Sequence, residues 1–352
     1  MNSSWGRALL ERGARIESGR VSGFGDSRRE APPATTGPVL TALLSQGLIL
    51  ASGADASTFL QGQLSNDIAL VSGSRAQLAA YCTPKGRVLA TLLLWKTGND
   101  YVLELSRELC APTRERLQMY VLRSRVQLTD ASDRTALIGL AGADALAVVH
   151  SELGLAPASN YDVAQNEGVA AIALPGARVQ VVADVARGVE IWDRLKRLCM
   201  VTGEEIWDAH AVAAGIPAIT TATQDQFTPH MLNLDLVGGV SFDKGCYTGQ
   251  EIVARTQYLG QVKRRLARFA TTAHTVPGAG VFADTAQVGT VINAARSPAG
   301  EFELLAVTKT HATQGRGHAA ALHLGADGPA LRPLLLPYAV PESPDRSTGD
   351  GD

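Results

Sequence analysis

The chain has 352 residues, of which 45% are hydrophobic and 19% charged, and its formal net charge is −2. This composition is typical of a globular protein and excludes a fibrous or wholly disordered chain, and the length is sufficient for two or three domains. The small net charge gives no general attraction for nucleic acid or anionic lipid. The longest strongly apolar stretch, residues 89–95, is far shorter than the roughly 20 residues of a membrane-spanning helix. We therefore expect no membrane contact and no direct nucleic-acid contact.

Residues 1–38 are expected to form a disordered tail. They lack the apolar core of a secretory signal and end in a cluster of Pro, Thr and Gly. Their six arginines are one mark of a mitochondrial address, but four acidic residues argue against it: Glu11, Glu17, Asp26 and Glu30. We expect a cytoplasmic, bacterial protein, with the mitochondrial matrix as the alternative.

Residues 39–155 are predicted to form an N-terminal α+β domain. Asp55 is placed to cap a short helix at 56–61. A second helix, with Leu109 and Leu117 on its apolar face, follows the first strands. The expected strands lie within 77–95, on either side of a turn at 83–86, and at 101–105 and 125–128. Strands followed by a helix and another strand favour an antiparallel sheet with helices on one face.

Residues 156–265 repeat this scheme and are predicted to form a ferredoxin-like α+β domain. Runs at 168–174 and 178–182 read as a hairpin. An amphipathic helix capped by Asp184 should follow, with five residues directed inward: Ile191, Trp192, Leu195, Leu198 and Cys199. Short β-rich runs then predict a small barrel-like domain over 266–340, and residues 341–352 read as a polar tail.

Four cysteines stand at 82, 110, 199 and 246 without any paired spacing. This pattern does not indicate a zinc or iron–sulfur site built from this chain alone, and it suits a reducing compartment. His210 and His230 have no partner at metal-ligand spacing, so we expect no metal site.

One octapeptide sets a single thiol apart. Residues 244–251 read Lys-Gly-Cys-Tyr-Thr-Gly-Gln-Glu. Thr248 and Glu251 have the spacing of a capping box, which predicts a helix that starts at Gly249 and ends near Gly260. Cys246 would then lie near the positive end of the helix, and Lys244 would add a cation, so the thiolate should be favoured.

With these residues in view, the chain resembles the folate-binding YgfZ-type proteins of iron–sulfur cluster assembly and repair, relatives of the glycine-cleavage T-protein. The resemblance runs from about residue 45 to about residue 265, and more loosely to 338. The octapeptide is its signature, and residues 59–67, 120–126 and 215–217 support it. It implies an α+β, T-protein-like multidomain ring with ferredoxin-like halves and a small C-terminal β-barrel. The resemblance also implies that the domain of residues 39–155 binds folate, in a central cavity of the ring with Cys246 at its edge.

The T-protein pattern differs from this chain at its acidic positions. Similarity to the T-protein places Ala90 and Thr91 where T-proteins carry an acidic pair, and Cys246 where they carry an aspartate. Neither alanine nor threonine can act as a general acid or base. The resemblance therefore favours thiol chemistry over carboxylate chemistry.

The folate-binding pattern is also altered. Relatives often carry a glutamate that faces the pterin where this chain has Ala213, so a bidentate acceptor is missing there. Trp207 matches a tryptophan that flanks folate in relatives, and its ring is a reasonable stacking partner for a pterin. Tetrahydrofolate or a folate derivative is still the expected ligand.

The resemblance implies a folate-binding accessory factor in assembly, repair or maturation of iron–sulfur proteins, with an indirect effect on tRNA modification. Iron–sulfur proteins or their assembly machinery are the expected partners, and a monomer is expected. Cys246 and Lys244 are the candidate catalytic residues. The candidate folate-binding residues are Trp207, Tyr247, Gly245, Gly249, Gln250, Glu251 and Arg255.

Several alternatives remain open. Glu251 is most simply a capping partner, and Arg255 is spaced to form an ion pair with it. Lys244 could be a solvated surface charge or a functional cation, and the sequence leaves both roles open. For the whole protein, the alternatives are a folate-dependent aminomethyl transferase, which needs a carboxylate near the folate, and a cysteine hydrolase or acyltransferase, for which no histidine and acid are evident.

Overall fold

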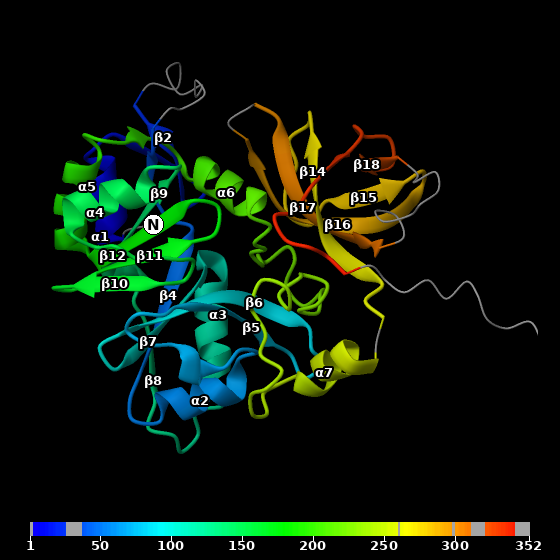
Figure 1. The fold of residues 1–352 in the computed structure, drawn as a ribbon, viewed down its shortest axis with the longest axis horizontal. Helices are drawn as coiled ribbons and strands as arrows, with labels where there is room; N and C mark the ends of the chain where they lie inside the picture. The colour runs from blue at the N-terminus through cyan, green and yellow to red at the C-terminus, as the bar shows by residue number, and fades with distance from the viewer. Residues whose placement is uncertain (1–2, 26–36, 260, 298–299, 311–320, 342–352) are drawn as a thin grey trace, which may run out of the picture.

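The computed structural model describes residues 3–25, 37–259, 261–297, 300–310 and 321–341, and it has a mixed α+β architecture (Figure 1). Three large sheets and one two-stranded hairpin organise the described residues. No helix in these ranges is long and apolar enough to cross a membrane.

The first sheet is antiparallel, with strand order β5-β6-β7-β4-β8. Two helices, α2 (Ala56–Gln63) and α3 (Arg107–Gln118), pack against its outer face. The strands are β4 (Gln46–Ser52), β5 (Gln77–Cys82), β6 (Val88–Thr97), β7 (Asp100–Ser106) and β8 (Gln127–Asp130). The strands predicted from the sequence are therefore confirmed. Asp55 does not cap α2, because its carboxylate instead accepts hydrogen bonds from Arg125.

The second sheet has the order β10-β11-β12-β9-β3-β13 and is antiparallel except between β13 and β3. Helices α1 (Ser4–Leu10), α4 (Ala145–Leu153) and α5 (Val185–Leu195) cover its outer face. Asp184 caps α5 as predicted, although Leu198 is 51% exposed and does not point inward. The strands are β3 (Val39–Ala42), β9 (Thr135–Ala141), β10 (Val163–Asn166), β11 (Val169–Leu174), β12 (Arg178–Asp184) and β13 (Met200–Val201).

The expected domain boundary at residue 155 divides this second sheet. Strands β3 and β9 precede that boundary, yet they pair with each other and β9 pairs with β12. The chain passes from the first sheet to the second between β8 and β9. The boundary is wrong because strand pairing here joins segments that are distant in sequence, and the local pattern does not carry that information.

The N-terminal segment is folded, which corrects the expectation of a disordered tail for residues 3–25. It forms α1 and a hairpin of β1 (Ala14–Glu17) and β2 (Arg20–Phe24). Trp5 is 2% exposed and meets Trp192 of α5 edge-on, with ring centroids 6.0 Å apart. The rest of the expected tail includes residues 26–36, which lie outside the described residues.

A buried carboxylate ties this segment to the second half of the chain. Glu204, in α6 (Glu204–Ala213), accepts hydrogen bonds from the amides of Val21, Leu44 and Ser45 at 2.7, 3.2 and 3.1 Å. Burial raises the pKa of Glu204, and the nearby Arg20 acts in the opposite direction. The hairpin and the start of the first sheet are thus anchored at one acid.

The third sheet has the order β18-β15-β16-β17-β14-β19 and curls around its own core (Figure 1). It confirms the predicted run of short strands within 266–340. Its strands are β14 (Arg264–Thr271), β15 (Gly280–Ala283), β16 (Ala286–Arg296), β17 (Phe302–Lys309), β18 (Leu322–Leu324) and β19 (Arg332–Leu334). The expected tail beyond residue 341 lies outside the described residues.

The first and second sheets pack face to face, and side chains from both fill the layer between them. Because side chains alternate along a strand, Leu103 and Leu105 of β7 face the helices, whereas Val102 and Glu104 face the second sheet. Apolar residues that include Trp95 and Ile172 fill the centre of this layer. Cavities remain at its two ends.

Trp5→Ala should lower the free energy of unfolding by about 3–5 kcal/mol, because it removes a buried aromatic side chain from the core. Urea unfolding followed by circular dichroism would measure this loss. The matched control is Leu10→Ala in the same helix, at a position that is 53% exposed, for which we expect about 0.5 kcal/mol or less. Equal stability of Trp5→Ala and the native protein would contradict a folded N-terminal segment.

Candidate functional site

Lys244 anchors the signature loop from its N-terminal side. Its ammonium donates hydrogen bonds to the carbonyl oxygens of Gln61, Leu64 and Asn66 at 2.7, 2.6 and 3.1 Å. Two of these carbonyls lie at the C-terminal end of α2, where unpaired carbonyls and the helix dipole favour a cation. Burial lowers the pKa of Lys244 to about 8, and Asp67 acts in the opposite direction, so the side chain remains protonated at neutral pH.

These contacts correct the expected catalytic role of Lys244. All three of its N–H donors are used by the segment 61–66. Its ammonium also lies 4.9 Å from the ring centroid of Tyr247. Among the described residues no hydrogen bond joins Lys244 to the thiol of Cys246. We therefore interpret Lys244 as a residue that positions the loop.

The C-terminal side of the loop is anchored by a close backbone approach. Gly249 has φ +84°, and a Cβ there would lie 2.4 Å from the carbonyl oxygen of Thr83. The amide of Thr248 donates to the carbonyl of Gly62 at 3.3 Å. Helix α7 (Gln250–Leu259) begins next, one residue after the predicted start. The predicted capping box is wrong, because the Thr248 amide bonds Gly62 instead of the Glu251 carboxylate.

Between these anchors the loop exposes two residues. Tyr247 is 7% exposed, whereas Gly245 and Cys246 face solvent. In the part of the chain that the structure describes, no hydrogen bond restrains the Cys246 thiol, and no histidine or acid is hydrogen-bonded to it. Among the described residues no group of His, Cys, Asp and Glu is placed to hold a metal ion.

The other three cysteines are far less accessible. Burial raises the pKa of Cys82 to about 12 and the pKa of Cys110 and Cys199 to about 11. Cys82 and Cys110 are fully buried, and Cys199 is half-buried beside the second core. Since the thiolate is the reactive form, these three thiols are poor candidates for a functional cysteine, and Cys246 is the exposed one.

The remaining signature residues lie on the surface around Cys246. Glu251 and Arg255 are exposed, and Gln250 is half-buried. The structure shows no ion pair between Glu251 and Arg255, so the expected pairing is not found. Helix α7 packs beside the first sheet, where Ile252 meets Gly86, and not on the second sheet, where the expected domain of 156–265 would place it.

Trp207 lies in a different place, at the cavity between the two sheets and α6. This cavity has a volume of about 120 Å³. Its lining residues come from β4, β5, β6, β7, β11, β12, α6 and the segment 216–218, together with Tyr161 and Pro175 from the loops beside β10 and β11. No residue of 244–251 lines it, and neither does Arg255. The expected grouping of Trp207 with the signature residues in one folate site is therefore not what the structure shows.

The face of Trp207 is not free for stacking. The guanidinium carbon of Arg178 lies 4.8 Å from the centroid of its ring, a cation–π contact. Gly139 lies against the same ring, where a Cβ would be 2.7 Å from Cε3. Arg178 and Trp207 thus form one packed unit at the cavity wall, and the expected stacking of a pterin directly on Trp207 would require Arg178 to move.

Buried polar groups surround this unit. Glu104 accepts a hydrogen bond from the side-chain amide of Gln180. Burial raises the pKa of Glu104 to about 7, opposed by Gln180 and Arg178, and burial lowers the pKa of Arg178 to about 10. The hydroxyl of Tyr161 is buried without a hydrogen-bond partner. An unpaired buried hydroxyl is costly, so this atom is a candidate ligand contact.

The N-terminal hairpin reaches the same cavity wall. Asp208 of α6 lines the cavity and forms an ion pair with Arg20 of β2. Burial raises the pKa of Asp208, and Arg20 acts in the opposite direction. The segment 3–25 therefore supports the cavity as well as the core.

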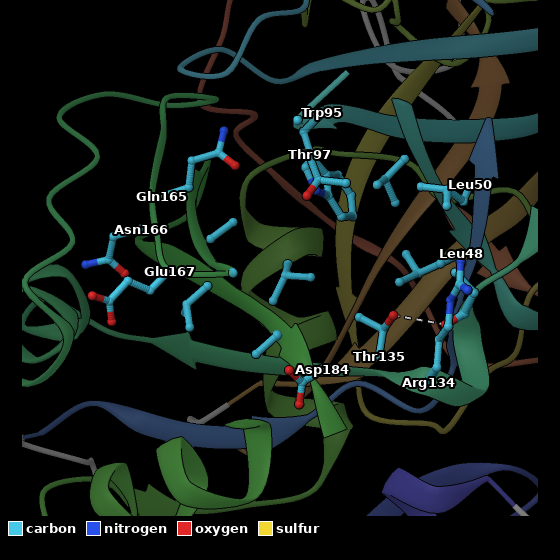
Figure 2. Close-up of a pocket in the computed structure, with 18 residues that line it drawn as sticks. Leu48, Leu50, Trp95, Thr97, Arg134, Thr135, Gln165, Asn166, Glu167 and Asp184 are labelled. Carbon is cyan, nitrogen blue, oxygen red and sulfur yellow. Dashed lines mark hydrogen bonds between the residues drawn. The ribbon is translucent and has the colours of Figure 1, made fainter. Parts of the chain in front are cut away.

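A larger cavity, of about 500 Å³, lies at the other end of the layer between the sheets (Figure 2). Leu48, Leu50 and Trp95 contribute to its apolar wall. Figure 2 shows Gln165, Asn166 and Glu167 on one side and Arg134 and Thr135 on the other, and the Thr135 hydroxyl donates to the carbonyl of Ala131 at 2.9 Å. None of its charged lining residues is buried. The smaller cavity is the better chemical site, because buried titratable groups line it.

Sequence reasoning missed Glu104 and Arg178. Both lie in runs that the sequence predicts only as strands. A charged residue at an inward position of such a strand is the signal that could have identified them. Glu104 is flanked by Leu103 and Leu105, which are 0% and 2% exposed.

Comparison with solved structures defines the class of fold. The chain superposes on the glycine cleavage system aminomethyltransferase T from Bartonella henselae with a TM-score of 0.76. The match covers 94% of this chain and 96% of that one at 15% sequence identity. The protein therefore has the α+β, T-protein-like fold that its sequence predicted.

Curated relatives define the family more narrowly. No family model matches the chain. It is 33% identical over 232 residues to the tRNA-modifying protein YgfZ of Shigella boydii, a match that covers 65% of this chain and 71% of the relative. The protein of that name from Yersinia pseudotuberculosis is 34% identical over 258 residues, or 71% of this chain and 77% of the relative. The chain belongs to the YgfZ family.

Lys244→Met should destabilise the protein by about 2–4 kcal/mol, because it leaves buried carbonyl groups without donors. Urea unfolding would measure the loss. Lys85→Met, at an exposed position of the turn before β6, is the control and should change stability by about 0.5 kcal/mol or less. If Lys244→Met were as stable as the control, the ammonium would not be the anchor of the loop.

Proposed function

We propose that the protein is a folate-binding accessory factor in the assembly, repair or maturation of iron–sulfur cluster proteins, and that Cys246 is its functional thiol. The presentation of Cys246 carries this proposal. The thiol is exposed on a loop fixed at both ends by Lys244 and Gly249, whereas the other cysteines are shielded. Such a thiol can contact a cluster, a cluster-bearing partner or an oxidised species without help from a neighbouring base.

The names of the relatives support an effect on tRNA modification. They are called tRNA-modifying proteins, and this chain has a net charge of −2, which offers no general attraction for RNA. An indirect route therefore fits better, in which the protein maintains an iron–sulfur enzyme that modifies tRNA. Iron–sulfur proteins or their assembly machinery are the proposed partners.

The small cavity supports folate as the ligand. The unpaired Tyr161 hydroxyl and the carboxylate of Glu104 offer polar contacts beside the Arg178–Trp207 unit. These groups fit a planar ring that carries both donors and acceptors. Bound folate would supply a one-carbon carrier, and the residues of this chain would hold and orient its ring.

Aminomethyl transfer is the second candidate function, and Glu104 is the observation that favours it. Ala90 is fully buried, and the Thr91 hydroxyl accepts a hydrogen bond from the Ile219 amide at 3.0 Å, so neither supplies an acid. Glu104, however, places a carboxylate in the same cavity as Thr91. Purified protein that forms a one-carbon adduct of tetrahydrofolate from an aminomethyl donor would favour this second function.

Two measurements test the first proposal. Titration with tetrahydrofolate should change tryptophan fluorescence, because Trp207 lines the cavity. In cells that lack the native protein, Cys246→Ala should fail to restore the activity of iron–sulfur enzymes, while Cys199→Ala, which removes a half-buried thiol, should restore it.

The two parts of the proposal can fail separately. If Cys246→Ala fully restored the activity of iron–sulfur enzymes, the proposed role of the thiol would be rejected. If the native protein showed no fluorescence change and no binding at high micromolar tetrahydrofolate, the folate-binding part of the proposal would be rejected.

A further inference from the structure

We propose that Glu104 recognises the donor edge of the ligand's ring, with Arg178 and Tyr161 as the matching donors for its carbonyl oxygen. This inference rests on the proposed function, because it assumes a folate in the small cavity. It assigns ring recognition to a residue outside the signature, and it supplies the acceptor that is missing at Ala213.

The buried position of the Glu104 carboxylate is unusual for a charged side chain. Its side chain lies on the inward face of β7, between two fully buried leucines, and it is only 7% exposed. Burying a carboxylate is unfavourable unless it is well paired. The structure gives it one hydrogen bond, from the neutral amide of Gln180 to Oε2, and no ion pair with a described residue. An apolar side chain would fill this position at lower cost, so the carboxylate is better explained by a ligand.

The surrounding atoms define the complementary ligand. A carboxylate accepts two parallel N–H bonds, while the Arg178 guanidinium and the Tyr161 hydroxyl can donate. The structure assigns the Arg178 Nε–H to the carbonyl of Pro175, at 2.9 Å, and leaves the Tyr161 hydroxyl unpaired. The complementary ring edge carries a ring N–H and an adjacent amino group, which donate to the carboxylate. Beside them it carries a carbonyl oxygen, which accepts from the guanidinium and the hydroxyl. The 2-amino-4-oxo edge of a pterin has this arrangement.

The size of the cavity limits what enters it. Its volume of about 120 Å³ is below the roughly 300–1,000 Å³ of pockets that enclose a drug-sized ligand. One planar ring system fits, and the remainder of a folate would extend outside. Affinity for the whole ligand should therefore depend on how well the ring edge is recognised.

Recognition of this kind depends on pH. Burial raises the pKa of Glu104 to about 7, so the carboxyl is increasingly neutral below pH 7 and ionised above it. The charged groups that face it are Arg178 of β12 and, farther along the wall, Asp208 of α6 with its partner Arg20. In the neutral acid one oxygen carries the proton, so it cannot accept two parallel N–H bonds, one on each oxygen, and affinity should rise between pH 6 and pH 8.

The test compares Glu104→Gln with the native protein in anaerobic tetrahydrofolate titrations at pH 6, 7 and 8. At pH 8 the variant should bind about 10- to 100-fold more weakly, as expected when hydrogen bonds to a charged acceptor are lost, and its affinity should not vary with pH. Glutamine keeps the size of the side chain and can still pair with Gln180, so the unfolding midpoint should change little. Glu115→Gln, on the exposed surface of α3, is the control and should bind like the native protein.

A second ligand separates edge recognition from a general loss of affinity. A tetrahydrofolate analogue without the 2-amino group should bind the native protein more weakly than tetrahydrofolate, and Glu104→Gln should no longer distinguish the two. If Glu104→Gln bound tetrahydrofolate as the native protein does, with the same pH dependence, the role of Glu104 would be rejected while folate binding stood. If the native protein bound no tetrahydrofolate at all, both this inference and the folate proposal would be overturned.

Discussion

The buried ammonium of Lys244 is the interaction on which the signature loop depends. It joins the end of α2 to a residue that lies 183 positions from Gln61 in the sequence, and it does so with three hydrogen bonds to main-chain oxygens. A lysine is suited to this role because it presents three donors from one point. Tyr247 is buried, and Gly249 is held against Thr83. Gly245 and Cys246, which lie between Lys244 and Tyr247, therefore face solvent. The exposed Cys246 follows from this arrangement.

The thiol and the small cavity occupy separate places on one scaffold. Cys246 belongs to the surface formed by α2, α7 and the turn at 83–86, whereas the cavity lies between the two sheets and is closed by α6. The N-terminal hairpin supports the cavity through the Arg20–Asp208 pair. A T-protein-like fold thus carries a cavity lined by buried charged groups and, apart from it, an exposed thiol on a fixed loop. Under the proposed function, the cavity binds folate while Cys246 contacts an iron–sulfur protein or its assembly machinery.

The sequence predicted the local features of the fold well and its long-range contacts poorly. Strands of the first and third sheets were found because short apolar, β-rich runs bounded by turn residues indicate strands even where both faces are buried. The fold of residues 3–25 was missed because short elements such as α1 are stabilised by Trp192 and Glu204, which lie far along the chain. The octapeptide singled out Cys246, which is exposed in the structure. The partners of Lys244 and the packing of Arg178 on Trp207, in contrast, follow from tertiary contacts that no residue spacing encodes.

The separation of thiol and cavity can be tested by alkylation of the folded protein with iodoacetamide, with and without saturating tetrahydrofolate. We expect Cys246 to react first, since the other thiols are buried or half-buried with raised pKa values. Its rate should be the same with the ligand bound, because no residue of the signature lines the cavity. Strong protection of Cys246 by tetrahydrofolate would place the ligand at the thiol and contradict the separation of the two sites.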